Sequence, residues 1–157
     1  MVGHSERRAA GDTDEQVARK VAAVAESGLI PVLFVGEDDR GDDAIALTEH
    51  RLRHGLSRIN LRSHPFLVVY EPSWAIGAEE AAPADHVGRA VEHLKAVLAG
   101  LGASPPEVVY GGTVAEDNIN EFARLDVLDG VGATRGSLDA ERFLQIIDQV
   151  TLGPRRQ

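Results

Sequence analysis

Residues 65–77 read Pro-Phe-Leu-Val-Val-Tyr-Glu-Pro-Ser-Trp-Ala-Ile-Gly. The apolar run up to Val69 predicts a buried strand, and this strand delivers the carboxylate of Glu71 at its C-terminal end. The proline that follows stops regular structure, and a loop with one tryptophan and a glycine comes next. This is the layout of a catalytic base beneath a closing loop.

The rest of the chain alternates short apolar runs with helical patterns. Continuous apolar runs are typical of parallel strands that are covered on both faces. The predicted strands are Ile30–Val35, Phe66–Tyr70, Val108–Tyr110 and Leu128–Ala133, with Met1–Gly3 as the tail of another. The predicted helices are Asp14–Ser27, Asp43–Arg53, Ala84–Ala99, Asp117–Leu125 and Asp139–Val150.

This order of elements predicts an α/β protein with a parallel sheet and right-handed crossovers. Two architectures fit the order, an open doubly wound sheet and a barrel. No Gly-x-Gly-x-x-Gly pattern follows an early strand, which weakens the dinucleotide-binding form of the open sheet. We expect one domain over residues 1–151 and a C-terminal tail over residues 152–157.

The composition narrows the classes of function. A chain of 157 residues, 43% of them hydrophobic, suffices for one domain with a core. The net charge of −9 argues against nucleic acid and against an anionic membrane, because both need a basic surface. It does not exclude an anionic substrate, since backbone N–H groups bind phosphate. The absence of cysteine excludes thiol chemistry and fits a cytoplasmic protein.

The distinctive residues of the chain all follow predicted strands. They are His4, Gly36-Glu37, Glu71, Gly111-Gly112-Thr113 and Thr134-Arg135-Gly136. The C-terminal ends of parallel strands meet at one edge of a sheet, so we expect these residues to gather where ligands bind. The other histidines show no metal-ligand spacing, and we expect them at solvated helix or loop positions: His50, His54, His64, His86 and His93.

Three of these segments resemble the motifs of one enzyme family. Gly3-His4-Ser5-Glu6-Arg7-Arg8 is similar to the electrophile motif of the triosephosphate isomerases, and residues 70–77 resemble their base and lid. Tyr110-Gly111-Gly112-Thr113-Val114 resembles their phosphate loop after the seventh strand. The order and spacing match as well. The resemblance implies a parallel (β/α) barrel of TIM type that is incomplete, with strands 4–8 of eight.

The resemblance also implies the roles of the site residues. Glu71 is the expected base that moves a proton between adjacent carbons, and His4 is the expected neutral electrophile. Glu6 completes the expected catalytic set, and Ser5 helps to hold the site. This family is itself the standard example of a histidine kept neutral by a helix N-terminus and of a lid that excludes water. The expected substrate-binding residues, besides Ser5, are Gly77, Gly112, Thr113, Thr134 and Arg135.

Aldose–ketose isomerisation needs residues of these types. A base must face the C–H bond, and a donor must face the oxygens on which enediolate charge develops; such a donor is worth about 3 kcal/mol. The expected function is therefore isomerisation of a short sugar phosphate, with no cofactor and no metal. The family resemblance further implies a homodimer that serves glycolysis and gluconeogenesis.

The chain departs from the family pattern in length. A barrel of this type takes about 250 residues, and the family's first three βα units have no counterpart here. They carry an asparagine–lysine pair and the loop of the dimer contact, whereas Lys20 and Lys95 fall in predicted helices. We expect a truncated gene model, ahead of a deliberate fragment or a half-barrel that pairs with another chain. Activity of the isolated chain is left open.

The second departure concerns the phosphate end of the site. Thr134-Arg135 stands where the family has a Gly-Gly pair, Thr113 replaces a serine, and Ala78-Glu79-Glu80 replaces Thr-Gly-Lys. Side chains narrow a nest of backbone N–H groups, while Arg135 adds a fixed charge. These changes suggest a paralogue that acts on a tetrulose phosphate. The alternative function is a non-catalytic half-barrel that binds phosphate ligands or assembles with a partner chain.

Overall fold

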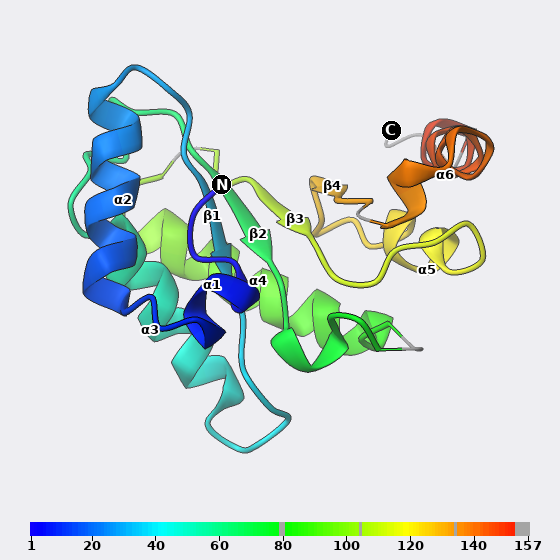
Figure 1. Ribbon diagram of the computed structural model, residues 1–157, viewed down its shortest axis with the longest axis horizontal. Coiled ribbons are helices and arrows are strands. Elements are labelled where there is room, and N and C mark those ends of the chain that lie inside the picture. Colours follow the sequence, from blue (N-terminus) through cyan, green and yellow to red (C-terminus); the bar gives the residue numbers. More distant parts are fainter. Residues whose placement is uncertain (79–80, 104, 134, 153–157) are drawn as a thin grey trace.

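A parallel sheet forms the centre of the molecule (Figure 1). The computed structural model describes residues 1–78, 81–103, 105–133 and 135–152. The strands are β1 (Val32–Val35), β2 (Leu67–Tyr70), β3 (Val108–Tyr110) and β4 (Gly130–Val131), paired in the order β1-β2-β3-β4. Val2 adds a parallel bridge to Leu33, on the side of β1 away from β2.

The order of the strands decides between the two predicted architectures. A doubly wound sheet reverses its strand order at a switch point, but the strands described here follow one another in space as they do along the chain. Right-handed crossovers in that order place the connecting helices on one side of the sheet. The chain is therefore an arc of a TIM-type α/β barrel, as predicted.

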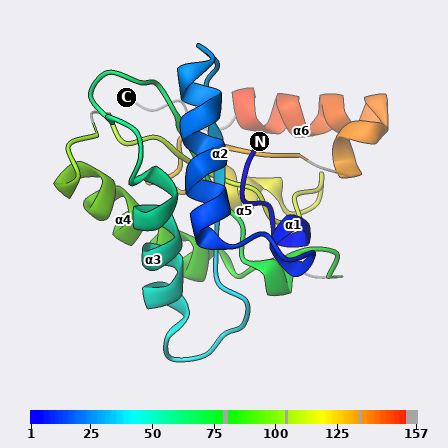
Figure 2. The same ribbon diagram turned by 60° about the vertical axis from the view of Figure 1, so that its left-hand side comes forward.

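The helices lie on the outer side of this arc, except the short first one, which buries none of its residues. They are α1 (Ser5–Ala9), α2 (Asp14–Glu26), α3 (Ala44–Leu56), α4 (Ala84–Gly100), α5 (Ile119–Ala123) and α6 (Ala140–Leu152), with short 3₁₀ turns η1 (Ser73–Ala75) and η2 (Arg135–Leu138). Helix α2 begins at a capping box between Thr13 and Gln16. It packs against α3, which in turn contacts α4 (Figure 2).

Four elements stand out as different from the prediction. Strand β1 begins at Val32 rather than Ile30, because Pro31 has no N–H for the ladder and Ile30 is 60% exposed. Helix α5 begins at Ile119, after the Asn118 side chain has accepted the N–H of Ala115 and held a turn. Strand β4 contains only two residues, and helix α1 was not predicted.

Alternate strand residues face opposite sides of the arc. Leu33, Val68 and Val108 face the helices and are fully buried. Phe34 and Val69 face the inner side, where the Phe34 ring meets the ring of His4 edge-on. This alternation continues past the strand ends. It therefore determines which side of the sheet Glu37, after β1, and Glu71, after β2, face.

Of the predicted C-terminal tail, residues 152–157, the structure describes only Leu152. Leu152 is the last residue of α6, and residues 153–157 lie outside the described residues. Within the described ranges, none of the helices is long and apolar enough to cross a membrane.

Candidate active site

Glu71 leaves the end of β2 on the inner side of the arc. Its backbone N–H donates to the carbonyl of Val35 at 2.7 Å, which extends the strand pairing by one residue. Pro72 cannot continue that pairing, since it has no N–H. The residue is only 4% exposed. The sheet therefore fixes the backbone of Glu71 and buries its carboxylate at the edge predicted from the sequence.

His4 reaches the same carboxylate from the N-terminus of α1. Its Nε2 lies 3.0 Å from Oε1 of Glu71, and its Nδ1 accepts the backbone N–H of Glu6 at 3.3 Å. An imidazolium has no acceptor nitrogen, so this arrangement describes a neutral ring whose proton is on Nε2. His4 is thus held as a neutral donor that points at Glu71.

The second carboxylate oxygen of Glu71 is also engaged. Oε2 accepts the backbone N–H of Ser5 at 3.0 Å. Burial raises the pKa of Glu71 above its usual value, while the Ser5 N–H and His4 act in the opposite direction and the nearby Glu6 adds slightly to the rise. The net rise in pKa makes Glu71 a stronger base than an exposed glutamate.

The other residues of the first motif surround a cavity. Ser5, Glu6 and Gly77 line a space of about 610 Å³ next to Glu71. The side chain of Glu6 is exposed at this cavity, and the structure gives it no hydrogen bond to the carboxylate of Glu71 among the described residues. The structure thus brings Ser5 into direct contact with Glu71 and leaves Glu6 at the rim.

The predicted phosphate loop is joined to the loop after β2. The hydroxyl of Thr113 donates to the carbonyl of Ala75 at 2.8 Å, and the side-chain amide of Asn118 donates to the carbonyl of Thr113. Gly112 packs so closely on Tyr110 that an added Cβ would lie 2.1 Å from the phenol oxygen. A glycine is therefore required next to Thr113.

The structure describes only part of the loop that follows β4, where the family's eighth-strand phosphate loop is expected. Arg135 begins η2 and is exposed, and among the described residues no hydrogen bond or ion pair joins it to the rest of the site. Thr134, Glu79 and Glu80 lie outside the described residues. No group of three or more His, Cys, Asp or Glu that could hold a metal occurs in the part of the chain that the structure describes.

Comparison with known families agrees with this geometry. The family model for triosephosphate isomerase matches residues 1–150. The chain belongs to the triosephosphate isomerase family. Curated triosephosphate isomerases are similar to it, from Dehalococcoides mccartyi (34% identity over 97% of this chain), Leifsonia xyli subsp. xyli (39% over 94%) and Marinobacter nauticus (41% over 93%). The chain spans 60–62% of the length of these relatives.

This member of the triosephosphate isomerase family contains a second buried acid, on the outer side of the arc. Glu37 follows β1 and is fully buried. Its Oε1 accepts the Tyr70 hydroxyl at 2.8 Å, lies 2.8 Å from Nε2 of His86, and accepts the indole N–H of Trp74 at 3.2 Å. Its Oε2 accepts the Thr48 hydroxyl at 3.0 Å. One carboxylate thus joins α3, β2, η1 and α4.

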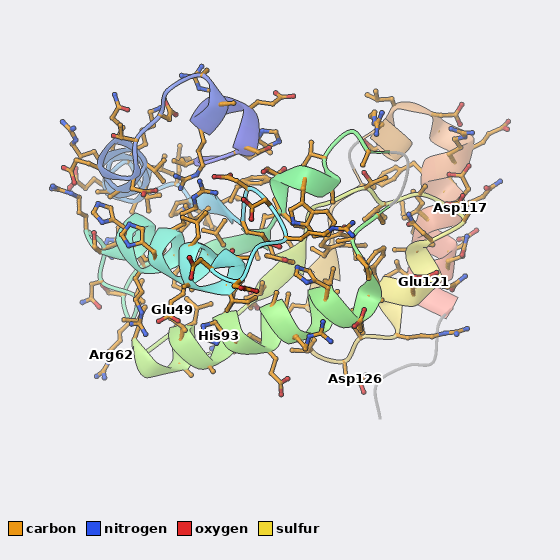
Figure 3. The ribbon with its side chains drawn as sticks, turned by 90° about the horizontal axis from the view of Figure 1, so that it is seen from below. Glu49, Arg62, His93, Asp117, Glu121 and Asp126 are labelled. Carbon is orange, nitrogen blue, oxygen red and sulfur yellow. The ribbon has the colours of Figure 1, made fainter. Side chains whose placement is uncertain are left out.

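The Glu37 cluster was not predicted. We expected His86 at a solvated position, and that prediction is wrong, because its side chain is 22% exposed and contacts buried Glu37. Glu37 does lie at the predicted edge, but the strand alternation turns it toward the helices. No sequence pattern links the two residues, since their contact depends on how α4 packs. His93, about two turns further along α4, pairs with Glu49 of α3 at 2.6 Å (Figure 3).

Proposed function

We propose that this chain carries the proton-transfer residues of an aldose–ketose isomerase that acts on a short sugar phosphate. The observation that supports the proposal is the contact of 3.0 Å between Nε2 of His4 and Oε1 of Glu71. A buried base and a neutral donor converge there from two distant parts of the chain. Isomerisation at adjacent carbons requires this pair of groups.

The proposed reaction places the substrate between the two side chains. Glu71 removes the proton from the carbon next to the carbonyl group, and the C–H electron pair moves to form an enediolate. The Nε2 proton of His4 stabilises the negative charge on the oxygen. His4 donates its Nε2 proton to that oxygen and takes the proton of the neighbouring hydroxyl in return, so its ring is neutral again. Glu71 then returns the carbon-derived proton to the neighbouring carbon, which completes the exchange of aldose and ketose. The family relationship supports these roles for His4 and Glu71, and a supporting role for Glu6.

The loop after β2 acts as the lid in this proposal. Gly77 lines the cavity beside Ser5, and Thr113 is bonded to Ala75 at the base of the loop. Closure would bring the backbone N–H of Gly77 to the phosphate group, together with Gly112 and Thr113. A closed lid keeps water from the enediolate.

The substrate proposed is a triose phosphate or a related tetrulose phosphate. The family relationship favours the first. Thr134 and Arg135 in place of the family's glycine pair favour the second, because side chains at a phosphate nest change its size and charge. Following the family, the protein would work in the cytoplasm as a homodimer, in glycolysis and gluconeogenesis.

An isomerase assay tests the proposal. This chain is compared with a version extended by the first three βα units of a curated relative, on triose and tetrulose phosphates. We expect the extended version to be active and Glu71→Gln to lower kcat by roughly 10²–10⁴-fold. Glu92→Gln, an exposed change on α4, is the matched control. Activity that survives Glu71→Gln removes Glu71 from its role, and preference for glyceraldehyde 3-phosphate ends the tetrulose hypothesis.

A second candidate function, a half-barrel that assembles with a partner chain, is favoured by α6. This helix packs on α5 and η2, at the end of the molecule away from α2 (Figure 1). Ile146 faces that contact and is buried, whereas Leu144 is 59% exposed. Four other large apolar side chains are also exposed on or just before α6: Leu138, Phe143, Ile147 and Val150. An apolar surface of this kind marks an interaction site.

Sedimentation velocity over a concentration series tests the second candidate. Self-association, or association with a separate chain that carries the first three βα units, is expected if α6 is an interface. Leu144→Glu should weaken it, while Glu141→Gln on the same helix should not. A chain that stays monomeric and binds no such partner excludes this candidate.

A further inference from the structure

Three hydrogen-bond donors face one carboxylate oxygen of Glu37, which is one more than its lone pairs. A carboxylate oxygen offers two lone pairs. Oε1 nevertheless faces the hydroxyl of Tyr70 at 2.8 Å, Nε2 of His86 at 2.8 Å and the indole N–H of Trp74 at 3.2 Å. The bond from Trp74 is the longest of the three. It is therefore the bond that yields first when either of the others strengthens.

His86 is the competitor that has an imidazole ring. Its Nε2 lies 2.8 Å from Oε1 of Glu37 and 2.9 Å from the Tyr70 hydroxyl, so this nitrogen carries a proton toward the two oxygens. Its ring meets the ring of Trp74 edge-on, with centroids 5.5 Å apart. The side chain also lines a cavity of about 460 Å³. Solvent protons can therefore reach the ring.

We propose that His86 is a positioning residue that competes with Trp74 for Oε1 of Glu37, so that an imidazolium loosens the loop after β2 and a neutral imidazole lets Glu37 hold it. A hydrogen bond from a charged donor is shorter and about twice as strong as one between neutral groups. Protonation of His86 thus draws the carboxylate away from the indole. The consequence for lid closure rests on the proposed function, but the competition itself does not.

The other ionisable groups around His86 include three whose pKa values are shifted away from neutral pH. Burial raises the pKa of Tyr70, so its phenol stays neutral near pH 7. The hydrogen bond from Arg53 lowers the pKa of Glu49, and the one from Arg89 lowers the pKa of Asp85. The charged and titratable groups facing this region are Glu37 and Arg40 from the β1–α3 loop, Tyr70 from β2, Glu49 from α3, and Asp85, Arg89 and His93 from α4 itself.

Arg40 explains where the indole goes when Glu37 releases it. Its guanidinium lies 4.0 Å from the centroid of the Trp74 ring. The cation–π contact keeps the ring at the cavity, while the N–H end is free to leave the carboxylate. The loop after β2 then loses its bond to the buried cluster at Trp74, while Ser73 stays bonded to the carbonyl of Glu37.

The chain offers a direct probe, because Trp74 is its one tryptophan. We would record the indole ¹H–¹⁵N cross-peak and the tryptophan emission of the full chain from pH 5 to 8.5. Histidine is the side chain whose charge ordinarily changes in this range. In the wild type we expect one transition, with the cross-peak moving upfield and the emission falling as the pH decreases.

Three variants decide the assignment. His86→Gln keeps an uncharged donor, so both signals should be independent of pH. His86→Ala removes the competitor, so the indole cross-peak should lie downfield of the wild type at every pH. His93→Gln, the matched control in the same cavity, should keep the wild-type transition.

The proposal is overturned if the wild-type indole signals do not change over this range, if the transition persists in His86→Gln, or if it disappears in His93→Gln. These readouts need no substrate. A failed isomerase assay therefore leaves them interpretable, and failure of the competition leaves the isomerase proposal intact.

Discussion

Nε2 of His4 and Oε1 of Glu71 lie 3.0 Å apart, in a geometry that neither residue creates alone. Strand β2 and its pairing with Val35 fix Glu71, while the backbone N–H of Glu6 fixes the tautomer of His4. The contact joins Glu71, whose pKa is raised by burial, to the neutral imidazole of His4. The free energy of unfolding of the protein should therefore depend on pH, and the raised pKa of Glu71 gives the direction.

Glu71→Gln should stabilise the fold more at neutral pH than in acid. Burial raises the pKa of Glu71 above 4.5, so the folded state keeps this proton at a pH where the unfolded state has lost it. Ionisation then costs folding free energy, and the cost grows as the pH rises above 4.5. The difference in the free energy of unfolding between the variant and the wild type should grow from pH 4 to pH 7 in urea titrations. A flat difference, as expected for the exposed control Glu92→Gln, would contradict this.

The inner half of the site could be predicted because its signals are local. A continuous apolar run followed by Glu71 and Pro72 specifies both a strand and its end. Parallel strands then place Glu71 and Thr113 at one edge without further information. The short helix α1 could not be predicted, since its five residues are mostly polar and it is set by the capping contact of His4.

The outer cluster depends on packing that no local pattern records. Glu37 and His86 meet because α4 packs against α3 and β3 and lies over Tyr70. The alternation of β1 could have indicated that Glu37 faces the helices, as Val35 does. The partners of Glu37 could not be predicted, because rotating α4 about its axis by one residue would place another side chain where His86 lies.

Thr113→Val should loosen the junction between the phosphate loop and the loop after β2. The change keeps the shape of the side chain but leaves the carbonyl of Ala75 without its donor at 2.8 Å. We expect a loss of about 0.5–1.5 kcal/mol in the free energy of unfolding, and a change in the emission of neighbouring Trp74. Thr113→Ser keeps the hydroxyl and should behave like the wild type. A loss in Thr113→Ser without one in Thr113→Val would show that the methyl group, not the hydrogen bond, matters.

Both tyrosines should resist ionisation until the chain unfolds. Burial raises the pKa of Tyr110 to about 12 and raises that of Tyr70 still further, with Glu37 adding to both. The folded state then holds protons that the unfolded state loses near pH 10, so stability should fall as the pH rises above 10. Absorbance at 295 nm should stay flat up to alkaline unfolding, and the two phenols should then ionise together. A reversible tyrosinate signal near pH 10, with the far-ultraviolet circular dichroism unchanged, would contradict the burial of these phenols.

Gly36→Ala should disrupt the backbone on which Glu71 is mounted. A Cβ at this position would lie 2.1 Å from the carbonyl oxygen of Glu71 and 2.8 Å from the nitrogen of Pro72, and neither backbone atom can turn aside. We expect a loss of about 3 kcal/mol or more in the free energy of unfolding. Gly88→Ala is the matched control, because its Cβ would meet only Leu125 at 3.7 Å inside α4. That change should stabilise the chain by about 0.5–1 kcal/mol, through the higher helix propensity of alanine. If urea titrations gave the two variants the same sign, the close approach of β1 to Glu71 would not be the constraint that the structure describes.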